Sequence, residues 1–211
     1  MNNEAYKGLS YTNKFGMTIL LSLQDILGKD EFSTVLGIAN LTHLLDNLPP
    51  DNLEKEFDFS NVSAINQALE QKYGWRGGRG LSLRAGREIF SRGFKNYGLL
   101  AGVEDVAFQK LPLEARLKIG LHAMVRIFTQ LSDQQIRLGE DQDTYIYTIT
   151  GCPDCLGRTD LDKPVCFMEV GLLQEGLNWI SGGSEFRINE SKCIGMGDEV
   201  CEFLIQKLPL G

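Results

Sequence analysis

Apolar residues at helical spacing dominate the first part of the chain. Leucines recur three and four residues apart over residues 20–27 and predict an amphipathic helix. A second helix is expected from Phe32 to about Leu48, where two prolines stop it. The acidic segment 51–59 shows no regular pattern and is expected to be irregular, and a third helix follows over residues 60–73.

A segment rich in glycine and arginine, YGWRGGRGLSLRAGR, occupies residues 73–87. Its glycines between positions 74 and 80 predict a turn, and the apolar spacing beyond them predicts a long helix from about Leu81. Another strongly periodic helix begins after Pro112 and continues to about Leu131.

The hydrophobic period then changes from helical to alternating. Residues 135–138 and 145–149 alternate around a GEDQD turn and predict a hairpin. A helix from about Cys166 to a glycine pair comes next, and a second hairpin turns at residues 196–198. This order predicts an α+β fold: N-terminal helices, then a four-stranded antiparallel sheet with a helix between its two hairpins. We expect a single domain over residues 1–211.

Composition excludes several classes of function. The chain has 43% hydrophobic and 23% charged residues, as globular proteins do, and its net charge of −7 disfavours sequence-independent binding to nucleic acid or to anionic membranes. No signal peptide pattern opens the sequence, and its longest apolar stretch, residues 17–27, is too short and too polar to span a bilayer. A cytoplasmic location without a membrane span is therefore expected.

The cysteines carry the clearest chemical signal. All five follow residue 151, and their odd number argues for metal-bound or free thiols in a reducing compartment. Cys166, Cys193 and Cys201 join Glu190 in an order that suits one tetrahedral zinc ion. Four protein ligands close the coordination sphere and leave no position for substrate, so this set predicts a structural metal rather than a catalytic one.

The spacing between Glu190 and Cys193 adds a structural requirement. Side chains three residues apart point to opposite faces of a flat strand. A bulge or bend is therefore expected here if both residues bind one ion.

A CxxC sequence, Cys152-Pro-Asp-Cys155, leaves alternatives open. Cys152 and Cys155 could join Cys193 and Cys201 in a four-thiolate site, or four of the five cysteines could hold an iron–sulfur cluster. Some of the cysteines could equally be small buried apolar side chains. A thioredoxin-type redox function is disfavoured, because no parallel βαβ order surrounds the motif.

The stretch PVCFMEVGLLQEGLNWISGGSEFRINESKCIGMGDEVCEFLI, residues 164–205, resembles the 4-vinyl reductase domain family, small-molecule-binding relatives of TRAPP vesicle-tethering subunits. The resemblance implies a TRAPP-like fold. It also implies the structural zinc of the family's aromatic-compound sensors, whose ligands correspond to Cys166, Glu190, Cys193 and Cys201. The segments YGWRGGRGLSLRAGR and CPDCLGR are similar to stand-alone members from cyanobacteria and other photosynthetic bacteria.

The function that this resemblance implies is non-enzymatic binding of a hydrophobic small molecule. A tetrapyrrole or chlorophyll-type pigment or precursor is expected, with a role in photosystem assembly or pigment biosynthesis and peripheral association with thylakoids through a partner. One alternative is a scaffold without ligand, in which residues 1–60 form a homodimer interface. Another is a vinyl reductase, against which the lack of a nicotinamide or flavin motif argues.

Other candidate residues have two interpretations each. The arginines of the middle segment could clamp carboxylates such as tetrapyrrole propionates, or form a solvated helix face with Glu88 as an internal partner. They are Arg76, Arg79, Arg84, Arg87 and Arg92. His122 is expected on the surface or in an interface, and His43 in the core or an interface. Large apolar residues that could line a ligand pocket, or simply fill the core, are Phe90, Phe94, Leu173, Leu177 and Trp179.

Overall fold

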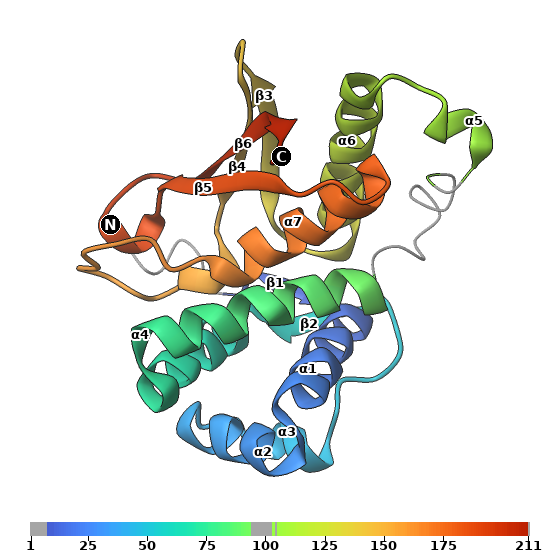
Figure 1. Ribbon diagram of the computed structural model, residues 1–211. Helices are drawn as coiled ribbons and strands as arrows, with labels where there is room; N and C mark the ends of the chain where they lie inside the picture. The colour runs from blue at the N-terminus through green and yellow to red at the C-terminus, as the bar shows by residue number, and fades with distance from the viewer. Residues whose placement is uncertain (1–7, 94–102, 104, 211) are drawn as a thin grey trace.

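A four-stranded antiparallel sheet in the order β3-β4-β6-β5 forms the C-terminal part of the protein (Figure 1). The computed structural model describes residues 8–93, 103 and 105–210. The strands are β3 (Gln135–Glu140), β4 (Thr144–Thr150), β5 (Phe186–Lys192) and β6 (Cys201–Pro209). Both predicted hairpins are confirmed, and pairing of β4 with β6 joins them into one sheet. The α+β prediction is therefore confirmed.

Helices pack on this sheet and on one another. They are α1 (Asn13–Leu27), α2 (Lys29–Ile38), α3 (His43–Asp46), α4 (Phe59–Arg92), α5 (Val106–Gln109), α6 (Leu113–Leu131) and α7 (Phe167–Ser181). The predicted helices after Pro112 and Cys166 are α6 and α7, and α7 ends at Gly182 in the left-handed conformation expected of a helix stop. None of these described helices combines the length and the apolarity that a membrane crossing requires.

Two predictions for the N-terminal region are wrong. The helix expected from Phe32 to Leu48 is interrupted, because Asn40 adopts a left-handed conformation (φ 58°) between α2 and α3. The segment expected to be irregular contains β2 (Lys55–Asp58), which pairs antiparallel with β1 (Ser10–Thr12). These strands are too short to show an alternating pattern in the sequence.

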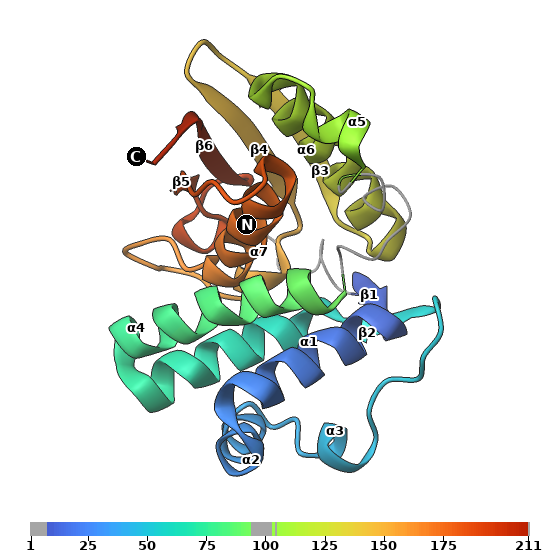
Figure 2. The same cartoon turned by 45° about the vertical axis from the view of Figure 1, so that its right-hand side comes forward.

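The glycine-rich segment also differs from the prediction. Helix α4 is a helical hairpin whose two arms reverse at Gly74 alone, which has φ 70° and ψ 169° (Figure 2). The glycines at positions 77, 78 and 80 lie within the second arm, which thus begins before Leu81. Gly78 is needed for close approach, since a Cβ there would lie 2.7 Å from the Cα of Glu70 in the first arm.

The second arm of α4 and helix α7 meet backbone to backbone. A Cβ added to Gly86 would lie 1.9 Å from the carbonyl oxygen of Met168, and one added to Gly171 would lie 2.1 Å from that of Leu83. Only glycine allows this approach. The contact fixes the start of α7, and therefore Cys166, on α4.

The apolar side chains of α1 and α2 are used within the chain. Leu20, Leu23, Phe32 and Val35 are each at most 4% exposed and belong to the core. They do not form the surplus apolar surface on which the homodimer prediction was based. The homodimer therefore stays a prediction without that support.

Candidate metal centre

All five cysteine side chains come together in the interior. Four elements supply them: the loop after β4, the start of α7, the end of β5 and the start of β6. Each cysteine is 1% exposed or less, and none forms a disulfide. They are Cys152, Cys155, Cys166, Cys193 and Cys201.

The distances between the sulfurs suit a metal–thiolate centre. The Sγ of Cys166 lies 3.6 Å from that of Cys152, 3.9 Å from that of Cys193 and 3.7 Å from that of Cys201. The Sγ atoms of Cys155 and Cys201 are 3.5 Å apart. Zinc–sulfur bonds of about 2.3 Å place two sulfurs of a tetrahedron roughly 3.8 Å apart. The observed distances lie on both sides of that value.

Two groups of four ligand atoms lie within 4.8 Å of one another. The first is the predicted set of Cys166, Glu190, Cys193 and Cys201. The second contains the CxxC cysteines, Cys166 and Cys201. In this second group Cys166 stands where the predicted four-thiolate alternative had Cys193.

Glu190 offers an oxygen that lacks a partner. Its Oε2 accepts a hydrogen bond from the backbone N–H of Cys166 at 2.9 Å, while its buried Oε1 has no hydrogen-bond partner among the described residues. Burial, followed by the neighbouring Cys193, raises the pKa of Glu190 to about 9. A buried carboxylate oxygen without a donor is costly, and a bound cation would satisfy it. The residues present therefore fit zinc.

The β5 strand contains the bulge that the sequence required. Glu190 pairs with Phe203, but Lys192 pairs with the adjacent Glu202, so one extra residue is inserted at Ser191. The bulge breaks the alternation and lets Glu190 and Cys193 face the same interior.

The loop that carries the CxxC is fixed on two sides. The backbone N–H of Glu169, in the first turn of α7, donates to Oδ2 of Asp154 at 3.0 Å. Burial raises the pKa of Asp154 to about 7. Arg158 donates two hydrogen bonds to Glu70 of α4, at 2.8 and 2.7 Å, and its side chain is only 9% exposed. Both contacts hold the loop against the elements that supply the other thiols.

Outer contacts orient the final turn. The backbone N–H of Ile194 donates to the Sγ of Cys201 at 3.4 Å, and that of Cys193 donates to Oδ2 of Asp198 at 2.8 Å. Such donors stabilise thiolates and hold metal ligands in place.

A cleft of 370 Å³ opens beside Glu190, between the second arm of α4 and the start of α7. Its wall includes the rings of Trp75 and Phe167, whose centroids are 5.4 Å apart. Lys163 Nζ lies 4.1 Å from the Trp75 centroid, and Arg79 Cζ lies 4.7 Å from the Phe167 centroid. Neither cation forms an ion pair with a carboxylate in the described part of the chain.

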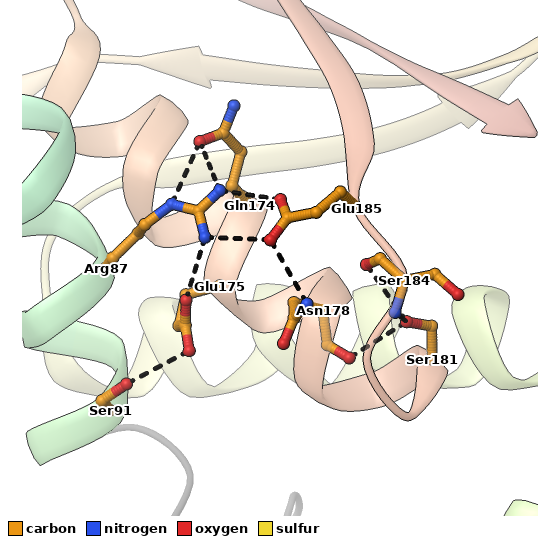
Figure 3. Close-up of polar contacts among 8 residues, drawn as sticks. All are labelled: Arg87, Ser91, Gln174, Glu175, Asn178, Ser181, Ser184 and Glu185. Atoms are coloured by element: carbon orange, nitrogen blue, oxygen red, sulfur yellow. Dashed lines mark hydrogen bonds and ion pairs between the residues drawn. The ribbon is translucent and has the colours of Figure 1, made fainter. Parts of the chain in front are cut away.

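The remaining arginines of the middle segment do not form a clamp. Arg87 links α4 to α7 and to the start of β5, because it donates to Glu185 at 2.8 Å and to Glu175 at 3.3 Å (Figure 3). Arg92 pairs with Asp25 of α1. The internal partners are therefore these acids and not the predicted Glu88.

Arg76 and Arg84 are exposed, which leaves Arg79 as the arginine of this segment that lines a described cleft. Sequence reasoning missed the partners of Arg79 in the cleft. Lys163 and Phe167 lie about 90 positions further along the chain and carry no local signal.

The other candidate residues are not part of the centre. His122 is exposed and its Nδ1 lies 2.8 Å from the carbonyl oxygen of Lys118, so the prediction of a surface position is confirmed. His43 is exposed as well, and the prediction of a core position is wrong.

The apolar residues predicted to line a pocket or fill the core mostly fill the core. Phe90, Leu173 and Leu177 are each at most 1% exposed, and Trp179 packs edge-on against Phe90. Phe94 lies outside the described residues.

Comparison with solved structures shows the fold. An H-NOX structure from a study of haem distortion has a TM-score of 0.60 at 14% identity, covering 95% of this chain and 97% of that chain. An unliganded Fe(II) H-NOX mutant from K. algicida gives 0.55 at 18% identity, with 92% and 95% covered. The Fe(II)NO form of an S. oneidensis H-NOX protein gives 0.52 at 16% identity, with 92% and 99% covered. These identities establish a shared architecture and nothing about ligands.

Sequence comparison gives a more specific result for one part of the chain. No curated protein matches the sequence. Residues 145–207, which span β4, α7, β5 and most of β6, match the family model of the 4-vinyl reductase domain. The resemblance seen in the sequence is thereby confirmed, and this chain carries a 4-vinyl reductase domain.

Proposed function

We propose that this protein is a non-enzymatic binding protein for a small molecule, in which a structural zinc ion fixes the 4-vinyl reductase domain. The observation that carries the metal is the convergence of five buried thiols on a carboxylate oxygen without a partner. We assign the ion to Cys166, Glu190, Cys193 and Cys201. Zinc supplies only a closed coordination sphere there, so it joins the start of α7 to the closing hairpin without reacting.

The alternative metals and ligand sets fit less well. A site of Cys152, Cys155, Cys166 and Cys201 leaves the Oε1 of Glu190 buried without a partner. An iron–sulfur cluster is larger than a single ion and binds each thiolate at a separate iron atom. Sulfurs between 3.5 and 3.9 Å apart are too close together for that arrangement.

The cleft beside Glu190 suits a ligand with a flat apolar ring and an acidic group. Trp75 and Phe167 offer aromatic surface, while Arg79 and Lys163 offer cations that face no described carboxylate. The N-terminus of α7 adds a partial positive charge. A tetrapyrrole with propionate groups has this chemistry, and haem distortion was studied in an H-NOX protein of the same fold.

A volume of 370 Å³ is near the lower end for small-molecule sites. We therefore place the acidic edge of a pigment in the cleft and the rest of its ring over the opening. The cellular role that goes with this ligand is pigment biosynthesis or photosystem assembly, in the cytoplasm or at the thylakoid surface through a partner.

Titration with protoporphyrin IX tests the ligand site. Binding is expected to quench tryptophan fluorescence and to shift the porphyrin absorption band at one porphyrin per chain. Replacing Arg79→Gln together with Lys163→Gln removes two charge-assisted contacts and is expected to weaken binding at least about tenfold. Arg84→Gln, an exposed position on the same helix, is the matched control and is expected to leave the affinity unchanged.

Unchanged spectra on titration would overturn the pigment assignment. Equal weakening by the Arg84 control and the double variant would instead show that only net charge matters, and the cleft assignment would be wrong. Neither outcome affects the zinc assignment, which elemental analysis of the purified protein tests directly: zinc is expected, and a metal-free or iron-containing protein would contradict it.

A further inference from the structure

The centre offers more ligands than one ion can use. Six donors, the five thiols and Glu190, fall into the two groups of four. An ion bound by Cys166, Glu190, Cys193 and Cys201 leaves Cys152 and Cys155 unused. Yet their sulfurs lie 3.6 and 3.5 Å from those of Cys166 and Cys201, within the range expected for neighbouring ligands of one ion.

The two groups share one edge. Cys166 and Cys201 belong to both groups, and their sulfurs are 3.7 Å apart. A thiolate sulfur has lone pairs enough to bind two metal ions at once. Two four-coordinate ions that share two bridging sulfurs need six donors, which is the number this centre provides.

We infer that the protein holds a dinuclear zinc–thiolate centre, in which Cys166 and Cys201 bridge the two ions. Cys152 and Cys155 complete the sphere of one ion, and Glu190 and Cys193 complete that of the other. This inference rests on the proposed zinc site and adds a second ion to it. It gives the CxxC loop a function that a single ion at the first set of ligands leaves unexplained.

The second ion adds no net charge to the interior. When it binds, the S–H bonds of Cys152 and Cys155 break, two zinc–sulfur bonds form, and two protons pass to solvent without any electron transfer. The two positive charges of the ion replace the two protons. The charge of the buried cluster is therefore the same with one ion or two, and no further desolvation of net charge opposes the second ion.

The structure holds the CxxC loop where the second ion needs it. Asp154, between the two cysteines, accepts the hydrogen bond from the first turn of α7, and Arg158 anchors the end of the loop on Glu70. These contacts place Cys152 and Cys155 beside the bridging thiols before any metal binds, so little loop ordering remains to oppose binding.

Metal counting on two matched double variants tests the inference. The full-length chain is purified under reducing conditions, dialysed against a weak chelator, and analysed for zinc per chain by native mass spectrometry and elemental analysis. Two zinc ions per wild-type chain are expected. Cys152→Ser with Cys155→Ser is expected to retain one, and Glu190→Gln with Cys193→Ser is expected to retain one as well.

Each other outcome has a definite meaning. One zinc in the wild type overturns the dinuclear centre while the proposed structural zinc stands, and the variant that then binds none identifies the ligands of that single ion. No zinc in the wild type overturns both. The two failures are thus distinguishable.

A measurement on the wild type alone covers the case in which a variant does not fold. Cobalt(II) is added stepwise to metal-free protein and followed by electron paramagnetic resonance. Thiolate bridges couple two high-spin cobalt ions antiferromagnetically, so the signal is expected to rise up to one equivalent and to fall between one and two. A signal that rises to one equivalent and then stays level would refute the bridge.

Discussion

The backbone contact between α4 and α7 makes a sharp prediction for Gly171→Ala. In a helix interior alanine is favoured over glycine by about 1 kcal/mol, which by itself would stabilise the protein. The added methyl group, however, would lie 2.1 Å from the carbonyl oxygen of Leu83 and 2.8 Å from its carbonyl carbon. A backbone carbonyl cannot rotate away, so α4 and α7 must separate by about 1 Å or more to restore ordinary contact.

Separation of these helices disturbs a packed core. Overpacking of this kind costs about 1–3 kcal/mol and occasionally more, which exceeds the gain in helix propensity. We therefore expect Gly171→Ala to lower the free energy of unfolding by about 2 kcal/mol, measured by urea denaturation at equilibrium with the slope of the transition compared.

Gly80→Ala is the matched control in α4. A Cβ at that position would meet nothing within 4 Å, so the propensity term acts alone and a gain of up to about 1 kcal/mol is expected. If both substitutions changed the stability in the same direction, the helices would not be in backbone contact at Gly171, and the packing argument would be refuted.

Three further predictions concern the contacts around the centre. Glu70→Gln leaves the nearly buried Arg158 without its partner and is expected to cost about 3 kcal/mol in thermal unfolding; Asp51→Asn, which breaks an exposed pair, is expected to cost under about 1 kcal/mol, and equal costs would contradict the difference in burial. Hydrogen bonding to Arg87 lowers the pKa of Glu185 below its ordinary value of 4.5. The pair therefore stabilises the fold above about pH 4.5 and loses this effect as the pH falls towards the lower folded-state pKa. The stability difference between wild type and Glu185→Gln, measured by urea denaturation, is expected to be present at pH 6, to stay under about 1 kcal/mol because Glu185 is exposed, and to shrink at lower pH; a difference independent of pH would exclude this pairing. Zinc removal by a strong chelator is expected to lower the unfolding temperature, and added zinc to restore it, because an ion that binds only the folded state stabilises that state; an unchanged unfolding temperature would rule out a structural metal.

The sheet and the later helices could be predicted because their signals are local. Alternation over residues 135–150 and the turn residues between the strands specify the first hairpin, and the glycine pair after Ser181 marks the end of α7. These features depend on side chains that lie near one another in the sequence.

The elements that the sequence did not reveal depend on distant contacts. Strand β1 has three residues and exists because it pairs with β2, more than 40 positions later. The glycines of α4 were interpreted together as a turn, but Gly74 provides a positive φ while Gly78 provides room for the opposite arm. Composition cannot separate these two uses of glycine, since the second depends on which helix lies across it.

The order of cysteines could indicate a metal site but not its extent. Glu190, Cys193 and Cys201 lie along one hairpin, so their proximity follows from the turn and the bulge. The CxxC loop comes from the far end of β4 and could only be offered as a rival set. In the structure it lies beside the same two sulfurs, because the loop is anchored on α4 and α7.

Glu190 connects the metal centre with the cleft, because it belongs to a ligand group of the first and to the wall of the second. A bound ion neutralises the carboxylate, so the cleft then presents Arg79 and Lys163 without an opposing negative charge. An acidic ligand should therefore bind more tightly to the metal-loaded protein, and by linkage the ligand should tighten metal binding by the same factor. Equal dissociation constants for protoporphyrin IX in zinc-loaded and in folded zinc-free protein would show instead that the two sites act independently.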